Sequence, residues 1–313
     1  MNKVFTDKEK LMIIELKSRG LSSREISKAL WGVESRKSTV NYFLARTNEI
    51  LETAKIFIWD VETAPNIGYF WSRWKQNIGE SQVVQNSYML TWSGKWLGDP
   101  TAIQRDLSDY GVDFTKPNDK ELVEELTEYL SEADIIVAHN GDAFDRTTFN
   151  ARAVYHGIPQ PSPYKTVDTL KIAKKQFRFP SNSLDSLSRY LELSEEKMKV
   201  DFSLWRRVME GDESAIKEMA EYCTQDVYTL EQVYLKLRPY DTRHPNVALH
   251  TDINVPRCTK CGSVDVEETG DFVYTNVSKF EHYRCNSCGS NLRGRSNKID
   301  KDVRGNILAN VVV

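Results

Sequence analysis

Apolar and polar residues recur at distinct intervals along this chain, and the intervals predict where strands and helices lie. Residues 56–63 form an apolar, alternating run typical of a strand, and further strands are predicted at 88–96, 102–107 and 134–139. The middle two are separated by a short turn and should pair antiparallel. Residues 214–238 carry apolar side chains every three or four positions, as one face of a helix does. The middle of the chain is therefore predicted to be an α/β core.

The N-terminal part has the pattern of three short helices. Thr6 and Ser22 each begin an S/T-x-x-E capping box, and Gly20 and Gly32 follow the two helices that start there. A third helix is predicted over 37–46. This arrangement resembles a helix-turn-helix domain, whose last helix enters the major groove of DNA, although a three-helix module that docks another protein is the alternative. The candidate DNA-contacting residues are Arg36, Lys37, Ser38, Thr39, Asn41 and Tyr42.

Four acids and a tyrosine stand in three separated motifs of the core elements. Asp60 and Glu62 lie two residues apart near the end of the first strand, so both side chains leave the same face. Tyr222 and Asp226 lie four residues apart on the long helix and also share a face. Asp145 falls in the first turn of a helix that follows the 134–139 strand, at the sheet edge where open α/β folds bind ligands.

Carboxylates without a neighbouring His or Cys cluster favour Mg²⁺ or Mn²⁺ over zinc. Two such ions about 3.5–4 Å apart can activate water and stabilise the leaving oxygen of a phosphodiester. Each acid taken singly is an ordinary solvated charge. Taken together, in three motifs of one predicted core, the set predicts a two-metal phosphodiesterase site.

Residues 55–240 resemble the DEDD, or DnaQ-like, 3′→5′ exonucleases, which have the RNase H-like fold. The likeness rests on the D-x-E, N-x-x-x-F-D and Y-x-x-x-D motifs and on supporting segments at 166–170 and 183–191. It implies a mixed five-stranded sheet with flanking helices. It also implies that two Mg²⁺ or Mn²⁺ ions are held by Asp60, Glu62, Asp145 and Asp226.

The same resemblance implies roles for residues beside the acids. Tyr222 would orient the attacking water, and a tyrosine in the third motif indicates the DEDDy branch, shared by polymerase proofreading domains and RNase D. Nucleic-acid contacts are expected at Thr63, Asn140 and Phe144. Asp142, an additional acid, is interpreted as the N-cap of the helix that carries Asp145.

Cysteines predict a second metal centre. Cys258-x-x-Cys261 and Cys285-x-x-Cys288 have the spacing of a zinc site, and a glycine after each pair permits the tight turn that such sites use. The module resembles a zinc ribbon holding one structural Zn²⁺. Two disulfides, the alternative, need an oxidising compartment that no other feature indicates. Cys223 is expected to be a buried thiol.

An insertion at residues 64–87 interleaves aromatic and basic side chains. Trp71 and Trp74, with Arg73 and Lys75 beside them, are expected to stack on unpaired nucleotides. A small hydrophobic cluster under a long loop is the alternative.

Composition agrees with an intracellular protein of more than one domain. The chain has 313 residues and a net charge of −3, but residues 1–50 hold ten Lys and Arg against six Asp and Glu, while residues 51–240 hold 22 against 30. A basic flank beside an acidic core is expected when separate modules hold a polyanion. Without a signal sequence or an apolar run of about 20 residues, a cytoplasmic protein with no membrane association is predicted.

These features predict a metal-dependent 3′→5′ exonuclease that converts DNA to 5′-mononucleotides. The domain order resembles exonucleases of bacteriophages, which act in replication, recombination or DNA degradation in the host cytoplasm, with a polymerase or another replication protein as a further partner. The alternatives are an exoribonuclease of RNase D type and a non-catalytic DNA-binding protein on a nuclease fold. Transposase-like enzymes, a further alternative, are disfavoured because their sites usually lack the D-x-E motif on the first strand. The predicted segments are a helix-turn-helix domain at 1–52, the exonuclease domain at 53–241, a linker at 242–256, a zinc ribbon at 257–291 and a basic, flexible tail at 292–313.

Overall fold

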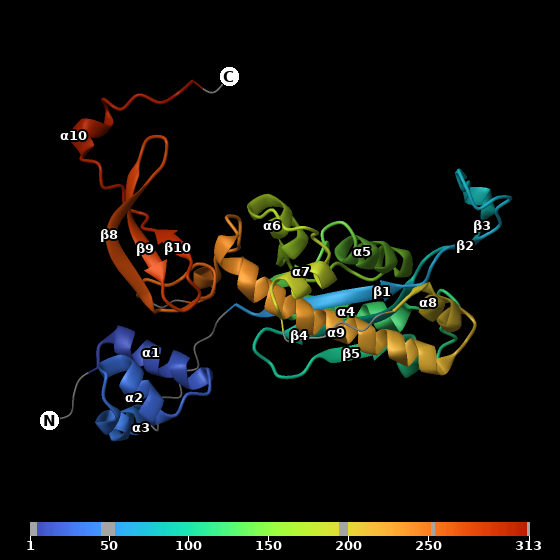
Figure 1. Cartoon of the computed structure of the whole chain (residues 1–313), viewed down its shortest axis with the longest axis horizontal. Helices are drawn as coiled ribbons and strands as arrows, with labels where there is room; N and C mark the ends of the chain where they lie inside the picture. The colour runs from blue at the N-terminus through green and yellow to red at the C-terminus, as the bar shows by residue number, and fades with distance from the viewer. Residues whose placement is uncertain (1–4, 45–53, 194–199, 252–253, 312–313) are drawn as a thin grey trace. The chain divides into compact units, whose positions relative to one another are not determined.

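The computed structural model describes residues 5–44, 54–193, 200–251 and 254–311 (Figure 1). The chain forms two compact units. One is Lys55–Arg243, and the other combines Met1–Ala54 with His244–Val313. The last residues of the predicted third helix, 45 and 46, and the predicted boundary at 52–53 lie outside the described residues.

The larger unit is built on a mixed five-stranded sheet in the order β5-β4-β1-β6-β7. The central strand β1 pairs antiparallel with β4 and parallel with β6, so the antiparallel and parallel halves of the sheet meet at β1. This confirms the predicted sheet, including the antiparallel pairing of the second and third strands. The strands are β1 (Ile56–Thr63), β4 (Met89–Trp96), β5 (Ile103–Asp106), β6 (Ile135–Ala138) and β7 (Lys165–Asp168).

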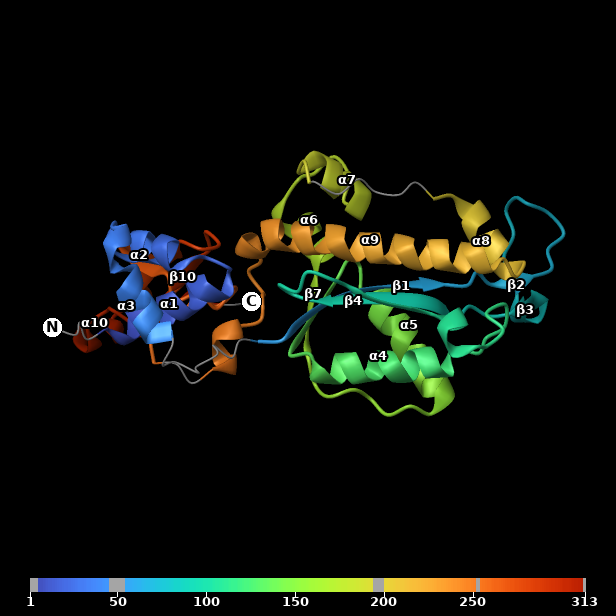
Figure 2. The ribbon, with the colours of Figure 1, turned by 90° about the horizontal axis from the view of Figure 1, so that it is seen from below.

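Helices cover both faces of this sheet. The long helix α9 (Glu213–Leu237), within one residue of its predicted bounds, crosses one face, whereas α4 and α5 cover the other (Figure 2). Phe57, Trp59 and Trp92 are fully buried on the α4 and α5 side. The other helices of this unit are α4 (Lys120–Glu132), α5 (Asp145–His156), α6 (Thr169–Gln176), α7 (Leu184–Tyr190) and α8 (Phe202–Met209).

Polar contacts fix the rotation of α9 on the sheet. The hydroxyls of Ser93 on β4 and Thr224 on α9 lie 2.8 Å apart, and one helical turn later the Tyr228 hydroxyl accepts a hydrogen bond from Ala102 N at 2.9 Å. Further along, Lys95 and Glu231 form a buried ion pair. These three α9 residues share a face. The face that carries Tyr222 and Asp226 is therefore held toward β1.

The predicted insertion forms a hairpin between β1 and β4. Its strands are β2 (Ile67–Gly68) and β3 (Val83–Gln85), which pair antiparallel. The hairpin extends beyond the end of β1, at the same end of the sheet as α8 (Figures 1 and 2).

In the smaller unit, the three predicted N-terminal helices are present, and both predicted capping boxes are formed at Thr6 and Ser22. Their apolar sides enclose Ile13, Ile26 and Val40. The cysteine-rich segment is a three-stranded antiparallel sheet in the order β10-β9-β8. The elements are α1 (Asp7–Ser18), α2 (Ser23–Trp31), α3 (Lys37–Leu44), β8 (Val266–Tyr274), β9 (Lys279–Cys285) and β10 (Asn291–Arg293).

The two ends of the chain contact each other within this unit. Lys8 Nζ on α1 donates to Val266 O at 3.1 Å, and Val264 N donates to the Glu15 carboxylate at 3.2 Å. The sequence patterns predicted the N-terminal helices and the cysteine-rich module as separate flanks. In the structure these two segments belong to one unit, and the two hydrogen bonds connect them. The bonded residues are about 250 positions apart in the sequence, so local sequence patterns could not reveal the contact.

The first part of the segment predicted as a tail, 292–313, holds regular structure. Lys298 N donates to Lys279 O at 2.7 Å, and a short helix α10 (Lys301–Arg304) follows. Val247, within the predicted linker, is buried and its N–H bonds Thr259 O at 2.9 Å. In the described residues, no helix combines the length and apolar character needed to cross a bilayer.

Candidate functional site

The exposed end of β1 carries the first two acids. Asp60 and Glu62 are half-buried and alternate with the buried Val61, as expected for one face of a strand. Burial, and then the neighbouring carboxylates of Asp145 and Glu62, raise the pKa of Asp60 well above its usual value. Asp226 acts on Asp60 in the same direction, so the four acids share one site.

Asp145 enters this site from the other side of the sheet edge. It is the first residue of α5, as predicted, and is 2% exposed. Its Oδ1 accepts a hydrogen bond from Val61 N at 3.2 Å, which fixes the carboxylate against β1. Burial raises the pKa of Asp145 to about 7 despite that hydrogen bond.

The turn before α5 requires unusual backbone geometry. Asn140 has a φ of 69°, and its carbonyl accepts from the N–H groups of Ala143 and Phe144 at 3.0 Å. A side chain at Gly141 would place its Cβ 2.3 Å from Ala138 Cβ. The tight turn therefore presses the backbone against β6 and brings Asp145 to the site.

The third part of the site comes from α9. Asp226 is buried and Tyr222 is half-buried one turn before it, so the phenol lies near the carboxylate on the same face of α9. Burial, followed by the charges of Asp226 and Glu62, raises the pKa of the Tyr222 phenol above its usual value. Tyr222 is therefore a neutral hydrogen-bonding group directed at the carboxylates.

All five residues that the sequence predicted for catalysis thus lie together. Their carboxylate oxygens suit hard divalent cations such as Mg²⁺ or Mn²⁺. Within the described residues, one set of His, Cys, Asp or Glu side chains has its ligand atoms within 4.8 Å of one another, and that set is the four cysteines. The four carboxylates do not form so tight a group in the described residues.

Two residues at this site were not predicted to have a role there. Cys223, confirmed as a buried thiol, lies with its Sγ 3.6 Å from Asp60 Oδ2. Trp205 on α8 donates its indole N–H to Thr63 O at 3.1 Å, and its ring lies 6.4 Å from the Tyr222 ring at an interplanar angle of 73°. The contacts of Cys223 with Asp60 and of Trp205 with Thr63 could not be inferred from spacing, because each joins residues more than 140 positions apart.

The interpretation of Asp142 as a helix N-cap is wrong. Phe144 occupies that position and makes no side-chain cap. Asp142 instead pairs with Lys171 at 2.6 Å and with Arg146 at 3.4 Å. The two cations offer the carboxylate stronger partners than backbone N–H groups do.

The predicted nucleic-acid contacts fall into three separate places. Thr63 and Asn140 flank the carboxylates, and Phe144 beside them is 44% exposed. Trp71 and Trp74 lie on the β2–β3 hairpin. In the smaller unit, Arg36, Lys37, Asn41 and Tyr42 are exposed and Thr39 is half-buried.

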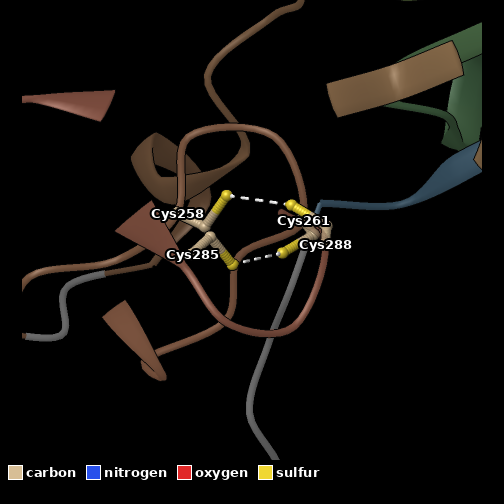
Figure 3. A group of neighbouring side chains, drawn as sticks. All are labelled: Cys258, Cys261, Cys285 and Cys288. Atoms are coloured by element: carbon tan, nitrogen blue, oxygen red, sulfur yellow. Dashed lines mark hydrogen bonds between the residues drawn. The ribbon is translucent and has the colours of Figure 1, made fainter. Parts of the chain in front are cut away.

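The four remaining cysteines converge in the smaller unit (Figure 3). The Sγ atoms of Cys258 and Cys288, and those of Cys261 and Cys285, lie 3.6 Å apart. This is too long for disulfides, whose S–S bonds are about 2.05 Å. Tetrahedral zinc with Zn–S bonds of about 2.3 Å would hold sulfur atoms about 3.8 Å apart. The geometry therefore fits one zinc ion and contradicts the disulfide alternative.

The two turns that hold these thiolates have the predicted form. Gly262 and Gly289 adopt φ values of 76° and 78°, which residues with a side chain rarely reach. Each donates its N–H to the carbonyl of the first cysteine of its pair. Lys260 N lies 3.4 Å from Cys258 Sγ, so backbone amides face the sulfur atoms.

Residues 105–238 match the family model described as the RNase_H superfamily. The matched stretch contains Asp145, Tyr222 and Asp226 and begins after Asp60 and Glu62. Together with the mixed sheet, this match shows that the larger unit has an RNase H-like fold. Nucleases of this fold act on nucleic acid and use divalent metal ions.

The structure is also similar to that of the family B DNA polymerase from the hyperthermophilic archaeon Pyrobaculum calidifontis. The TM-score is 0.43 and the sequence identity is 12%, over 62% of this chain and 26% of the polymerase chain. This chain thus corresponds to about a quarter of that polymerase's length. No curated protein matches the sequence.

Proposed function

We propose that the protein is a metal-dependent 3′→5′ exonuclease of the DEDDy type that hydrolyses DNA to 5′-mononucleotides. The observation that carries this proposal is the convergence of Asp60, Glu62, Asp145 and Asp226 with Tyr222 at the end of β1. A set of four acids is too highly charged for ordinary packing, and the tyrosine beside them supplies a neutral donor.

The four carboxylates would hold two Mg²⁺ or Mn²⁺ ions. When bound, such ions supply charge stabilisation for the phosphodiester and make water more acidic. The chain itself contributes a rigid frame: Val61 N orients Asp145, and the α9 contacts orient Asp226. Tyr222 holds the attacking water by a hydrogen bond.

The Tyr222→Phe variant tests that last role. Removing the hydroxyl while keeping the ring should lower the single-turnover rate of cleavage by about 10²-fold or more, the range for groups that position or protonate reactants. Tyr228→Phe, on the same helix, is the control, because its hydroxyl bonds Ala102 N and faces away from the acids. An unchanged rate for Tyr222→Phe would show that the hydroxyl has no catalytic role and that the ring only packs against Trp205.

The activity itself is tested with DNA and RNA strands labelled at the 5′ or the 3′ end, in Mg²⁺, Mn²⁺ or chelator. We expect stepwise shortening from the 3′ end of DNA that stops with chelator. Preferential digestion of RNA would support an exoribonuclease of RNase D type instead. A protein that binds the strands and cleaves none of them in either metal would be a non-catalytic binding protein.

The smaller unit would hold the DNA on which the nuclease acts. The exposed residues Arg36, Lys37, Asn41 and Tyr42 at the start and along one side of α3 suit the major groove of a helix-turn-helix complex. The zinc ribbon would stabilise this unit. The likeness to bacteriophage exonucleases extends the proposal to phage DNA replication, recombination or degradation in a host cytoplasm, with a polymerase as a further partner.

A further inference from the structure

The β2–β3 hairpin exposes an unusual amount of aromatic surface. Trp71 is 98% exposed, Trp74 81%, Tyr69 78% and Phe70 59%. Burial of such rings normally contributes strongly to folding, and a cluster left in solvent marks an interaction site. The sequence-based alternative of a small hydrophobic cluster under the loop is therefore wrong.

The hairpin that carries these rings is held by a built frame. Tyr69 N donates to Gln82 O at 2.9 Å, and Gln82 Nε2 donates to Tyr69 O at 3.0 Å. At the base, Ser87 N donates to Asn66 Oδ1 at 2.8 Å. Gly68 permits the close approach of the strands, since a Cβ there would lie 2.6 Å from Gln82 O. The rings are thus displayed from a fixed support, which lowers the entropy lost on binding.

The charges on the hairpin indicate what it binds. Arg73 and Lys75 stand among the rings, and residues 65–79 contain no Asp or Glu. Within the described part of the chain, neither cation is paired with an acid. A ligand that presents flat rings and regularly spaced negative charge matches this surface. Unpaired nucleotides do so, whereas the bases of a duplex already stack on each other.

The hairpin is placed to deliver a strand to the carboxylates. It starts at Ile67, five residues after Glu62, and projects from the same end of the sheet as α8 (Figures 1 and 2). On α8, Phe202 is 68% exposed and stacks on Trp205 at 6.5 Å and 7°. Trp205 in turn contacts Tyr222. Aromatic rings therefore continue from the surface to the candidate catalytic residues.

We propose that Tyr69, Phe70, Trp71, Trp74 and Phe202, here called the aromatic platform, hold the unpaired segment of the substrate strand by base stacking. This inference rests on the proposed nuclease function and makes single-stranded nucleic acid, or a frayed duplex end, its substrate. The duplex would be held elsewhere, so the platform governs which strand end reaches the carboxylates.

Binding is measured with a labelled single-stranded oligonucleotide in Mg²⁺, using an Asp226→Asn background so that the strand is not degraded. Removing one ring from a stacking platform weakens binding about 5- to 150-fold. Trp71→Ala with Trp74→Ala should therefore weaken single-strand binding by at least about 20-fold, and Trp71→Phe with Trp74→Phe should retain most of it. Tyr155→Ala, which removes a 67% exposed ring on α5, is the matched control and should bind normally.

Salt dependence separates stacking from charge. The tryptophan variants should lower affinity without altering its dependence on salt, because they remove no charge. Arg73→Gln with Lys75→Gln should instead reduce the slope of log affinity against log salt by about 0.7 for each phosphate that the variant no longer neutralises. The same double tryptophan variant, with Asp226 intact, should degrade single strands poorly at low substrate concentration.

The possible results distinguish the two proposals. If the wild-type chain degrades no nucleic acid but the tryptophan variants still lose single-strand binding, the nuclease proposal fails and the aromatic platform stands. If the wild-type chain is active but the alanine variants bind and degrade single strands as it does, the platform proposal is overturned and the hairpin is left for a protein partner. If the tryptophan-to-alanine variants lost affinity equally for single strands and for blunt duplexes, the platform proposal would also be overturned.

Discussion

The Asp226→Asn variant is expected to lose more than about 100-fold of the exonuclease rate in Mg²⁺ while the larger unit remains folded. Residues that only support a metal ligand contribute about 10- to 100-fold, so loss of a ligand itself should cost more. Asn keeps the shape of Asp226 on α9 but removes a charge. Because burial and neighbouring acids already disfavour ionisation of Asp60, removing one charge relieves repulsion and should leave thermal unfolding unchanged or slightly higher.

Asp142→Asn provides the matched control for that experiment. Asp142 is an acid three residues before Asp145, but it pairs with Lys171 and Arg146 rather than with the site. Its variant should retain most of the activity. Near-normal cleavage by Asp226→Asn, or an equal loss in both variants, would contradict the assignment of Asp226 as a metal ligand.

Much of the core and of the acidic site could be predicted because the signals are local. An apolar alternating run ending in Asp60 and Glu62 specifies both the strand and the shared face of the two acids. A helical repeat through Tyr222 and Asp226 does the same for α9. Element ends in an α/β fold gather at one sheet edge, so three local patterns sufficed to bring Asp145 to the others.

Contacts between distant segments could not be predicted in this way. The place of Trp205 beside Thr63 and Tyr222 depends on how α8 packs, which its own sequence does not encode. Asp142 was misassigned because an acid just before a helix is typical of an N-cap. Its ion pair with Lys171 depends on where α6 lies in the fold, which the sequence around Asp142 does not indicate. The hydrogen bonds of Lys8 and Glu15 to the segment 264–266 likewise required the tertiary structure.

Those contacts between the chain ends make the zinc site important beyond the ribbon. Metal binding to a structural four-cysteine site contributes about 10–16 kcal/mol, which is most of the stability of so small a sheet. Glu15 and Lys8 on α1 bond to Val264 and Val266, which lie between the two cysteine pairs. Loss of zinc should therefore remove a packing surface from the N-terminal helices, although those helices contain no cysteine.

The Cys258→Ser, Cys261→Ser double variant is expected to lose its zinc, to unfold the smaller unit at a lower temperature and to bind long DNA weakly with a flatter salt dependence. It should still cleave short oligonucleotides, because all five candidate catalytic residues lie within Lys55–Arg243. Metal analysis, thermal unfolding and binding at several salt concentrations measure these effects. Wild-type protein should contain close to one zinc per chain.

Two variants separate the role of the metal from that of the hydrogen bonds around it. Cys223→Ser should keep its zinc, because Cys223 lies beside Asp60 in the other unit. Lys8→Ala with Glu15→Ala should also keep zinc but lower the stability of the N-terminal helices, since their bonds to the ribbon are removed together with the Glu15–Arg19 ion pair on α1. If the double cysteine variant retains zinc and long-DNA affinity, the thiolates do not form the metal site. If it loses cleavage of short oligonucleotides while Lys55–Arg243 stays folded, the smaller unit takes part in catalysis itself, and the proposal that it only recruits long DNA is contradicted.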